Sequence, residues 1–173
     1  GGNYGFSLAV TDLNDDGFDE LIVGMPGAPI GGITVGAIDI WVGGPDGLIY
    51  GSRHFPPDFS TQPGGRFGAA LAADDGVLFI GAPEALVDGL ASGGVYVATF
   101  NPFQGFCIQE RVDQDTPGIG GVAEAGDGWG TSLDAYRTTV NAFRVGVGAP
   151  REDLGGAVDA GAVWDMAWRI EES

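Results

Sequence analysis

The chain alternates short apolar runs with turns that contain glycine or polar residues. Residues 22–23, 78–80 and 145–147 form short apolar runs bounded by turn residues, and residues 95–100 are rich in side chains that favour strands. No apolar run reaches the roughly 18 residues that a membrane-spanning helix needs. The pattern therefore predicts an all-β protein of many short strands, without membrane insertion.

The same order of features occurs three times along the chain. An aromatic residue followed by glycine begins each unit, then an apolar run ends in Gly-x-Pro, and a further strand follows a glycine. The aromatic-Gly pairs are Tyr4-Gly5, Phe67-Gly68 and Trp129-Gly130, and the Gly-x-Pro ends are Gly24-Met25-Pro26, Gly81-Ala82-Pro83 and Gly148-Ala149-Pro150. A fixed order at a period of about sixty residues indicates a repeat protein.

Each unit is predicted to be one antiparallel sheet. Residues 48–50 and 106–108 supply a fourth strand in the first two units, and four antiparallel strands per unit are typical of a propeller blade. The predicted units are residues 1–62, 63–125 and 126–173. The third unit ends where its fourth strand is expected.

Aromatic-Gly, an Asp-rich loop and Gly-Ala-Pro, in this order, resemble the FG-GAP repeats of integrin α subunits and of bacterial secreted proteins. The resemblance implies a β-propeller, and closed propellers have about four to eight blades. Three units either belong to a longer protein or assemble, for example as two chains that together supply six blades. In both cases we expect apolar sheet faces at both ends of the unit stack, which need to be covered.

The clearest chemical motif is an Asp-rich loop in the first unit. Its sequence is Asp12-Leu13-Asn14-Asp15-Asp16-Gly17-Phe18-Asp19-Glu20. Calcium prefers six to eight oxygen ligands, and alternating positions of a tight loop direct their side chains toward one centre. We predict a calcium site formed by the side chains of Asp12, Asn14 and Asp16, the backbone carbonyl of Phe18, and the carboxylate of Glu20. An ordinary Asp/Asn/Gly turn is the alternative.

This loop is not an EF-hand. The twelfth position of an EF-hand loop is a glutamate, whereas here it is Val23 at the end of a predicted strand. The resemblance to FG-GAP blades, which carry such a loop in a β-hairpin, implies an aspartate at the ninth position. Glu20 stands there instead, which leaves open whether Asp19 or Glu20 closes the site.

The other units lack this motif. The second has a tight hairpin turn at Asp74-Asp75-Gly76, and the third has residues 134–139 as a predicted loop with one carboxylate and an arginine. One metal site is therefore expected, with a structural role.

The net charge and the few reactive side chains limit the classes of function that the chain can have. The net charge is −17, from 24 acidic residues against 7 basic ones, all arginine, so the surface should repel nucleic acid and anionic membranes and attract divalent cations. The single Cys107 is expected to be a small buried side chain, and the single His54 is placed in a loop between units. No nucleophile elbow, zinc-protease motif or phosphate loop is present, so no catalytic residue is assigned.

The sequence predicts a non-enzymatic, calcium-binding, extracellular or cell-surface propeller segment. Its expected role is a scaffold for protein interaction, adhesion or self-assembly into a homo-oligomer. Trp164 and Trp168 share one face of a predicted strand, and that face serves either blade packing or carbohydrate stacking, so a lectin-like propeller is one alternative. A non-catalytic accessory domain of a secreted hydrolase is the other.

Overall fold

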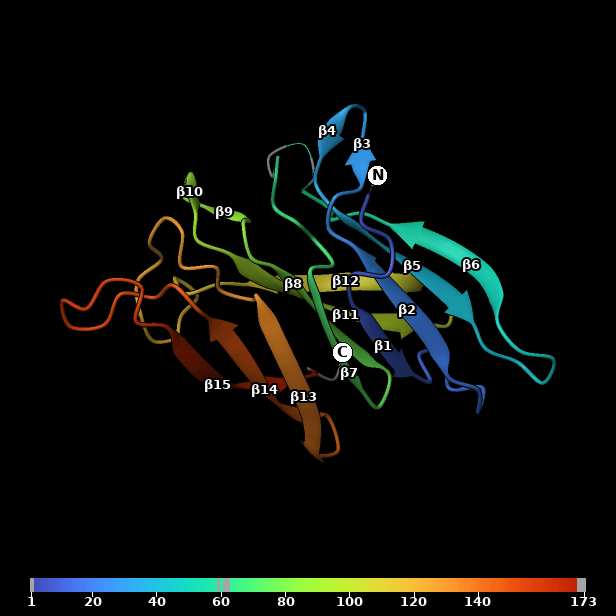
Figure 1. The fold of residues 1–173 in the computed structure, drawn as a ribbon. Coiled ribbons are helices and arrows are strands. Elements are labelled where there is room, and N and C mark those ends of the chain that lie inside the picture. The colour runs from blue at the N-terminus through green and yellow to red at the C-terminus, as the bar shows by residue number, and fades with distance from the viewer. Residues whose placement is uncertain (1, 59, 61–62, 171–173) are drawn as a thin grey trace.

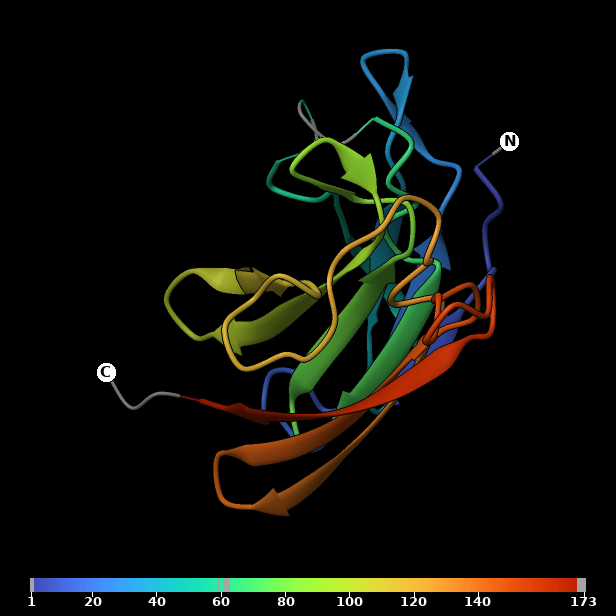
Figure 2. The same ribbon diagram turned by 90° about the vertical axis from the view of Figure 1, so that its left-hand side faces the viewer.

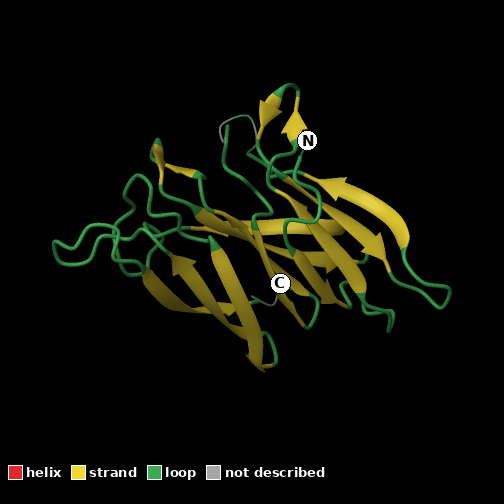
Figure 3. Cartoon of the chain, in the orientation of Figure 1, coloured by secondary structure: helices red, strands yellow, loops and turns green. Residues whose placement is uncertain are grey.

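The computed structural model describes residues 2–58, 60 and 63–170, and this part of the chain contains strands but no helix (Figure 3). The all-β prediction is confirmed. Among these residues no helix is long and apolar enough to cross a membrane.

The strands form three antiparallel sheets in chain order. Sheet I contains β1 (Leu8–Thr11), β2 (Glu20–Met25), β5 (Ala37–Val42) and β6 (Ile49–His54); sheet II contains β7 (Ala70–Asp74), β8 (Val77–Ala82), β11 (Gly94–Asn101) and β12 (Gly105–Val112); sheet III contains β13 (Ser132–Thr139), β14 (Ala142–Ala149) and β15 (Ala162–Arg169). Two small hairpins, β3 (Pro29–Ile30) with β4 (Ile33–Thr34) and β9 (Leu86–Val87) with β10 (Leu90–Ala91), interrupt the connections from the second to the third strand of sheets I and II. In each sheet, consecutive strands pair side by side.

The three sheets stand next to one another like the blades of a propeller, with sheet II in the middle (Figure 1). Their first strands β1, β7 and β13 are neighbours in this arrangement. Figure 2 views the stack from the end formed by sheet III, whose strands lie in front of the other two sheets.

Two hydrophobic cores fill the spaces between the sheets. Because side chains alternate along a strand, β8 contributes to both. Leu78 and Ile80 pack in the core shared with sheet I. Val77 and Phe79 pack in the core shared with sheet III. Sheet II is therefore apolar on both faces, as the central layer of a stack must be.

The second and third aromatic-Gly pairs lie at the junctions between sheets. Phe67 is 1% exposed and Trp129 is 0% exposed, and each belongs to the core between its own sheet and the preceding one. Each also forms a parallel bridge to a glycine of the preceding repeat, Phe67 with Gly36 and Trp129 with Gly93. Tyr4, in the same position of the first repeat, is 55% exposed.

Some local predictions are confirmed and others are wrong. Asp75 and Gly76 form a two-residue hairpin turn with φ angles of 47° and 74°, as the Asp-Gly signal predicted. Residues 134–139 are not a loop: they belong to β13, because a left-handed Asn141 (φ 63°) closes the β13–β14 hairpin beyond them. His54 is the last residue of β6, since that strand pairs with β5 as far as Ile38.

Cys107 lies in β12 and is partly exposed, so the prediction of a buried thiol is wrong. The fourth strand of a blade lies at the outer edge of its sheet, where one side of the backbone has no neighbouring strand. A small side chain there is covered only on one side.

The two ends of the sheet stack differ. The end at sheet I, here called the N face, exposes the apolar or aromatic side chains of Tyr4, Leu8, Val10 and Tyr50 beside Trp41. The end at sheet III, here called the C face, presents alternate residues of its strands: Ser132, Asp134, Arg144, Gly146, Gly148, Val163 and Asp165. The expectation of an apolar face at both ends is therefore correct for the N face and wrong for the C face, which is mixed.

Candidate metal centre

The Asp-rich loop connects β1 to β2 and is held together by its own side chains. Asp15 and Gly17 adopt left-handed φ angles of 60° and 87°, which bend the loop back on itself. Asp12 stabilises this turn by accepting hydrogen bonds from the backbone N–H groups of Asp16 (3.2 Å) and Gly17 (2.8 Å).

Asn14 and Asp16 continue the same network. The side-chain oxygen of Asn14 accepts from the N–H of Asp16 (3.0 Å), and Asp16 accepts from the N–H of Phe18 (2.9 Å). The amide nitrogen of Asn14 donates to the second oxygen of Asp16 at 3.0 Å. The structure thus brings the first three predicted ligands into one hydrogen-bonded loop.

Glu20, the first residue of β2, is a buried carboxylate with 2% exposure. Its Oε2 accepts from the N–H of Leu13 (2.8 Å) and its Oε1 from the N–H of Gly43 (3.3 Å), which lies in the turn between β5 and β6. The same Oε1 is 3.5 Å from the amide nitrogen of Asn14. Asp19 is exposed, and neither Asn14 nor Glu20 lines the hollow to which it belongs. Of the two residues that sequence left open, Glu20 is the one beside Asn14.

The atoms that this loop offers as ligands are of the kind that calcium binds. Its candidate donors are carboxylates, an amide oxygen and a backbone carbonyl, which are the oxygen ligands that calcium prefers. Within the described residues, however, no three acidic, histidine or cysteine side chains already converge on one point. Asp12 and Asp16 direct oxygens at backbone N–H groups, and a bound ion would use the lone pairs that these hydrogen bonds leave free.

A large acidic hollow of about 780 Å³ lies beside this loop. It is lined by Asp12, Asp15, Asp19, Asp74 and Asp75, with Arg137 of β13 among them. The backbone N–H of Arg137 donates to Asp74 (2.6 Å), and its guanidinium pairs with Asp75. Sequence reasoning missed this contact, because residues 134–139 were assigned to a loop. The hollow joins all three repeats at one rim.

His54 lines a smaller cavity of about 340 Å³ between sheets I and II. Its Nε2 is 2.7 Å from the hydroxyl oxygen of Ser52, and its ring lies on Phe106 with centroids 4.5 Å apart. Burial lowers the pKa of the His54 imidazole, which favours the neutral ring. In a catalytic triad a third group orients the histidine. The ring contact packs His54 of sheet I against Phe106 of sheet II.

Trp164 and Trp168 both turn toward sheet II. The indole N–H of Trp164 donates to the carbonyl of Gly120 (2.6 Å), and that of Trp168 pairs with Glu110. Both rings pack on the core between sheets II and III. Of the two roles left open by sequence, this arrangement corresponds to blade packing.

A second polar cluster lies where the linker before sheet III meets the loop after β14. The side-chain amide of Gln114 donates to Glu152 at 2.7 Å, and both residues are buried. Burial raises the pKa of the Glu152 carboxyl, and nearby Asp127, Glu124 and Asp153 raise it further, against the opposing effect of Gln114.

Glu152→Gln is expected to stabilise the fold at pH 7 and to lose this advantage at pH 4. Because the folded-state pKa of Glu152 lies above its ordinary value of 4.5, the wild type loses stability as pH rises from 4.5 through that pKa. Glutamine has no proton to lose and can still accept from Gln114. Thermal melts of both proteins at the two pH values test this. An equal difference at pH 4 and pH 7 would contradict it.

Stacked antiparallel sheets with buried aromatic-Gly junctions define a propeller-type repeat protein. Residues 4–48 match the family model of the FG-GAP repeat, which confirms the predicted repeat family. The match spans β1, β2 and β5 of sheet I, and sheets II and III share its architecture by their geometry. No curated protein matches the chain. FG-GAP repeats occur in extracellular propeller and adhesion-type domains and typically in surface proteins.

Proposed function

We propose that this chain is a calcium-binding, non-catalytic propeller segment that acts outside the cell as a scaffold for protein interaction, adhesion or self-assembly. The observation that carries the proposal is the loop from Asp12 to Glu20. Its oxygen-bearing side chains are organised on a rigid β-hairpin, and Glu20 connects them to the β5–β6 turn through Gly43.

A calcium ion in this loop would have a structural role. The loop contains several carboxylates within a chain of net charge −17, and their mutual repulsion destabilises the folded hairpin. A cation that binds only the folded state adds stability by mass action, about 2.7 kcal/mol at a concentration one hundred times its dissociation constant. Extracellular calcium sites commonly bind in the range of about 0.1 to 1 mM.

The scaffold role is supported by what the sheets expose. Rigid sheets hold the connecting loops at fixed positions, where recognition is commonly carried. The N face presents an apolar surface with the aromatic pair Trp41 and Tyr50, whose ring centroids are 5.5 Å apart. Such a surface is typical of protein contacts. Trp164 and Trp168 are engaged in packing, which favours a scaffold over a lectin-like propeller.

Isothermal titration calorimetry should detect one calcium equivalent per chain. Asp16→Asn is expected to weaken binding at least about tenfold, since a carboxylate ligand becomes a neutral amide of the same shape. Asp46→Asn is the matched control, because Asp46 is an exposed carboxylate in the β5–β6 turn, outside the loop. No heat of binding at millimolar calcium, or equal weakening by both variants, would contradict the proposal.

A further inference from the structure

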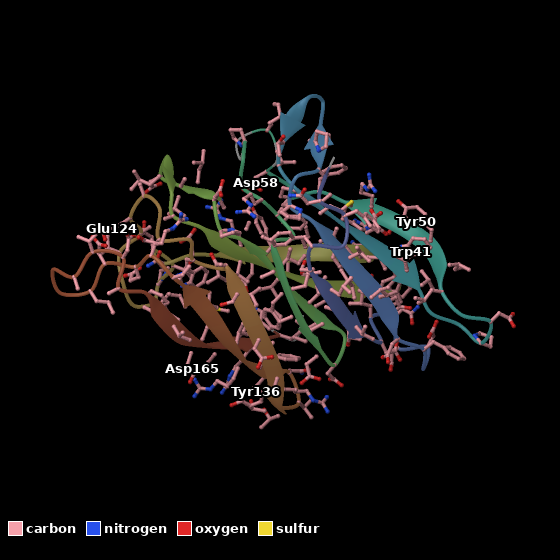
Figure 4. The ribbon with its side chains drawn as sticks, in the orientation of Figure 1. Trp41, Tyr50, Asp58, Glu124, Tyr136 and Asp165 are labelled. Atoms are coloured by element: carbon pink, nitrogen blue, oxygen red, sulfur yellow. The ribbon has the colours of Figure 1, made fainter. Side chains whose placement is uncertain are left out.

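The cavity of about 340 Å³ that His54 lines lies between sheets I and II, on the side of sheet I away from the N face. Side chains alternate between the two faces of a strand. Trp41 and Tyr50 lie together on the N face of β5 and β6 (Figure 4). Ile40 and Ser52, which pair across the same two strands, face the other way and line the cavity. Both walls of the cavity therefore belong to four-stranded sheets of this chain.

Most of the cavity wall is apolar. Leu13, Ile40 and Val42 contribute aliphatic side chains from sheet I and the loop between its first two strands. Phe100 of β11 and Phe106 of β12 contribute two rings from sheet II. An engineered cavity of about 150 Å³ lined by such side chains stays dry and binds benzene. The present volume is about twice as large, so it accommodates a molecule of about two fused rings.

A hydrogen-bonded pair of polar side chains is set into this apolar wall. Ser52 and His54 are alternate residues of β6, and the hydroxyl oxygen of Ser52 is 2.7 Å from Nε2 of His54. Burial lowers the pKa of the imidazole, which favours the neutral ring.

This pair offers one donor and one acceptor in either of its two arrangements. When Ser52 donates to Nε2, the neutral His54 ring carries a donor at Nδ1 and the serine oxygen can still accept. When Nε2 donates to Ser52, the serine hydroxyl is the donor and Nδ1 is the acceptor. A hydroxyl group both donates and accepts, so it matches the pair in both arrangements.

The rest of the lining favours an aromatic and uncharged molecule. The ring of His54 lies on that of Phe106 with centroids 4.5 Å apart, and aromatic rings gain from such offset or edge contacts. The buried carboxylate of Glu20 also lines the cavity, so an anion would meet a like charge away from water. An apolar cavity with a few convergent polar groups is the usual composition of a small-molecule site.

We propose that the cavity between sheets I and II binds a free, uncharged aromatic alcohol of about two rings, whose hydroxyl pairs with Ser52 and His54 and whose rings lie against Phe106. This function goes beyond the scaffold role proposed above and does not depend on it. A tyrosine side chain of a protein partner carries the same chemical groups, but its single ring would fill only about half of the volume. The volume therefore favours a small molecule as the occupant.

Isothermal titration calorimetry of the full chain with 2-naphthol tests the proposal. 2-Naphthol is an uncharged two-ring alcohol, and one equivalent should bind with a dissociation constant of about 0.1 mM or lower. 2-Naphthoate, in which a carboxylate replaces the hydroxyl, should bind at least about tenfold more weakly because of Glu20. 4-Methylphenol, which reproduces the side chain of tyrosine, should also bind more weakly. Tighter binding of 4-methylphenol than of 2-naphthol would indicate a partner's tyrosine as the occupant and would overturn the proposal.

Two variants with matched controls locate the bound molecule. Val42→Phe fills the cavity from β5 and should abolish binding, whereas Val140→Phe adds the same ring at an exposed residue between β13 and β14 and should bind like wild type. Ser52→Ala removes one member of the polar pair and should weaken binding about three- to tenfold. Ser132→Ala, on the C face, should leave the affinity unchanged. Far-ultraviolet circular dichroism checks that all four variants retain their sheets.

Two results would overturn the proposal directly. One is that 2-naphthol binds wild type, Val42→Phe and Ser52→Ala with equal affinity, because the molecule would then lie elsewhere on the chain. The other is that 2-naphthol does not bind at all. Saturation-transfer difference NMR on the same mixtures detects binding that releases no heat, so a silent titration alone is not counted as absence of binding.

The outcome is separable from that of the calcium proposal. Leu13, Asn14 and Glu20 line the cavity and belong to the Asp-rich loop, whereas Ser52 and His54 lie outside it. We therefore expect 2-naphthol to bind both in millimolar calcium and in the presence of a chelator. Calcium binding without 2-naphthol binding in either buffer would overturn only the cavity proposal. Binding of 2-naphthol to a chain that binds no calcium would overturn only the calcium proposal.

Discussion

Gly93→Ala is expected to destabilise the protein by about 2 to 5 kcal/mol. Two costs add at this residue. Its φ of 110° lies outside the regions open to L-residues, which costs about 1 to 2 kcal/mol. The added Cβ would also collide with the backbone of Trp129, 2.7 Å away at its nitrogen. Backbone cannot rotate aside as a side chain can, so overpacking adds about 1 to 3 kcal/mol.

Gly89→Ala separates these two costs. Gly89 lies in the β9–β10 turn of the same repeat and has a φ of 87°, but a Cβ there would meet nothing within 4 Å. Its alanine variant should lose only the conformational part, about 1 to 2 kcal/mol. Urea denaturation of the three proteins measures the difference. Equal destabilisation by both substitutions would show that the close approach at the sheet II–sheet III junction has no energetic weight.

Trp129→Ala is expected to cost about 3 to 5 kcal/mol, because it removes a fully buried ring from the core between sheets II and III. The ring is also in edge contact with Trp164, with centroids 6.4 Å apart. For a domain whose total stability is about 5 to 15 kcal/mol, this loss approaches unfolding.

Two controls make this prediction specific to the junction. Trp129→Phe should cost less, since it keeps a ring in place and the indole nitrogen has no hydrogen-bond partner in the described structure. Tyr4→Ala, at the same repeat position but 55% exposed, should cost much less. Chemical denaturation tests the series. A cost at Tyr4 as large as that at Trp129 would contradict the distinction between the buried and the exposed aromatic-Gly pair.

The repeat pattern predicted the antiparallel sheets and the turn at Asp75 and Gly76, but not the loop of the third repeat. The Asp-Gly pair at residues 75–76 specified its turn type, because that depends on local backbone geometry. The Asp-rich loop was located in the same way, and the structure places Asp12, Asn14 and Asp16 in one network.

Other features depended on contacts distant in sequence. Arg137 meets Asp74 and Asp75 across more than sixty residues, and no local pattern marks that pairing. Glu20 accepts a hydrogen bond from Gly43, which lies in a turn 23 residues further along the chain. The sequence pattern also did not distinguish the two end faces of the stack. The register of β13, β14 and β15 decides which of their side chains point away from the core, and it is these side chains that make the C face polar.

The most direct test of the calcium loop is a crystal structure of the protein grown in millimolar calcium, with data collected at a long wavelength where calcium scatters anomalously. We predict one strong anomalous peak within the loop, coordinated by Asp12, Asn14, Asp16, the carbonyl of Phe18 and the carboxylate of Glu20. An empty loop at that calcium concentration, or a peak bound elsewhere on the acidic surface, would contradict the account.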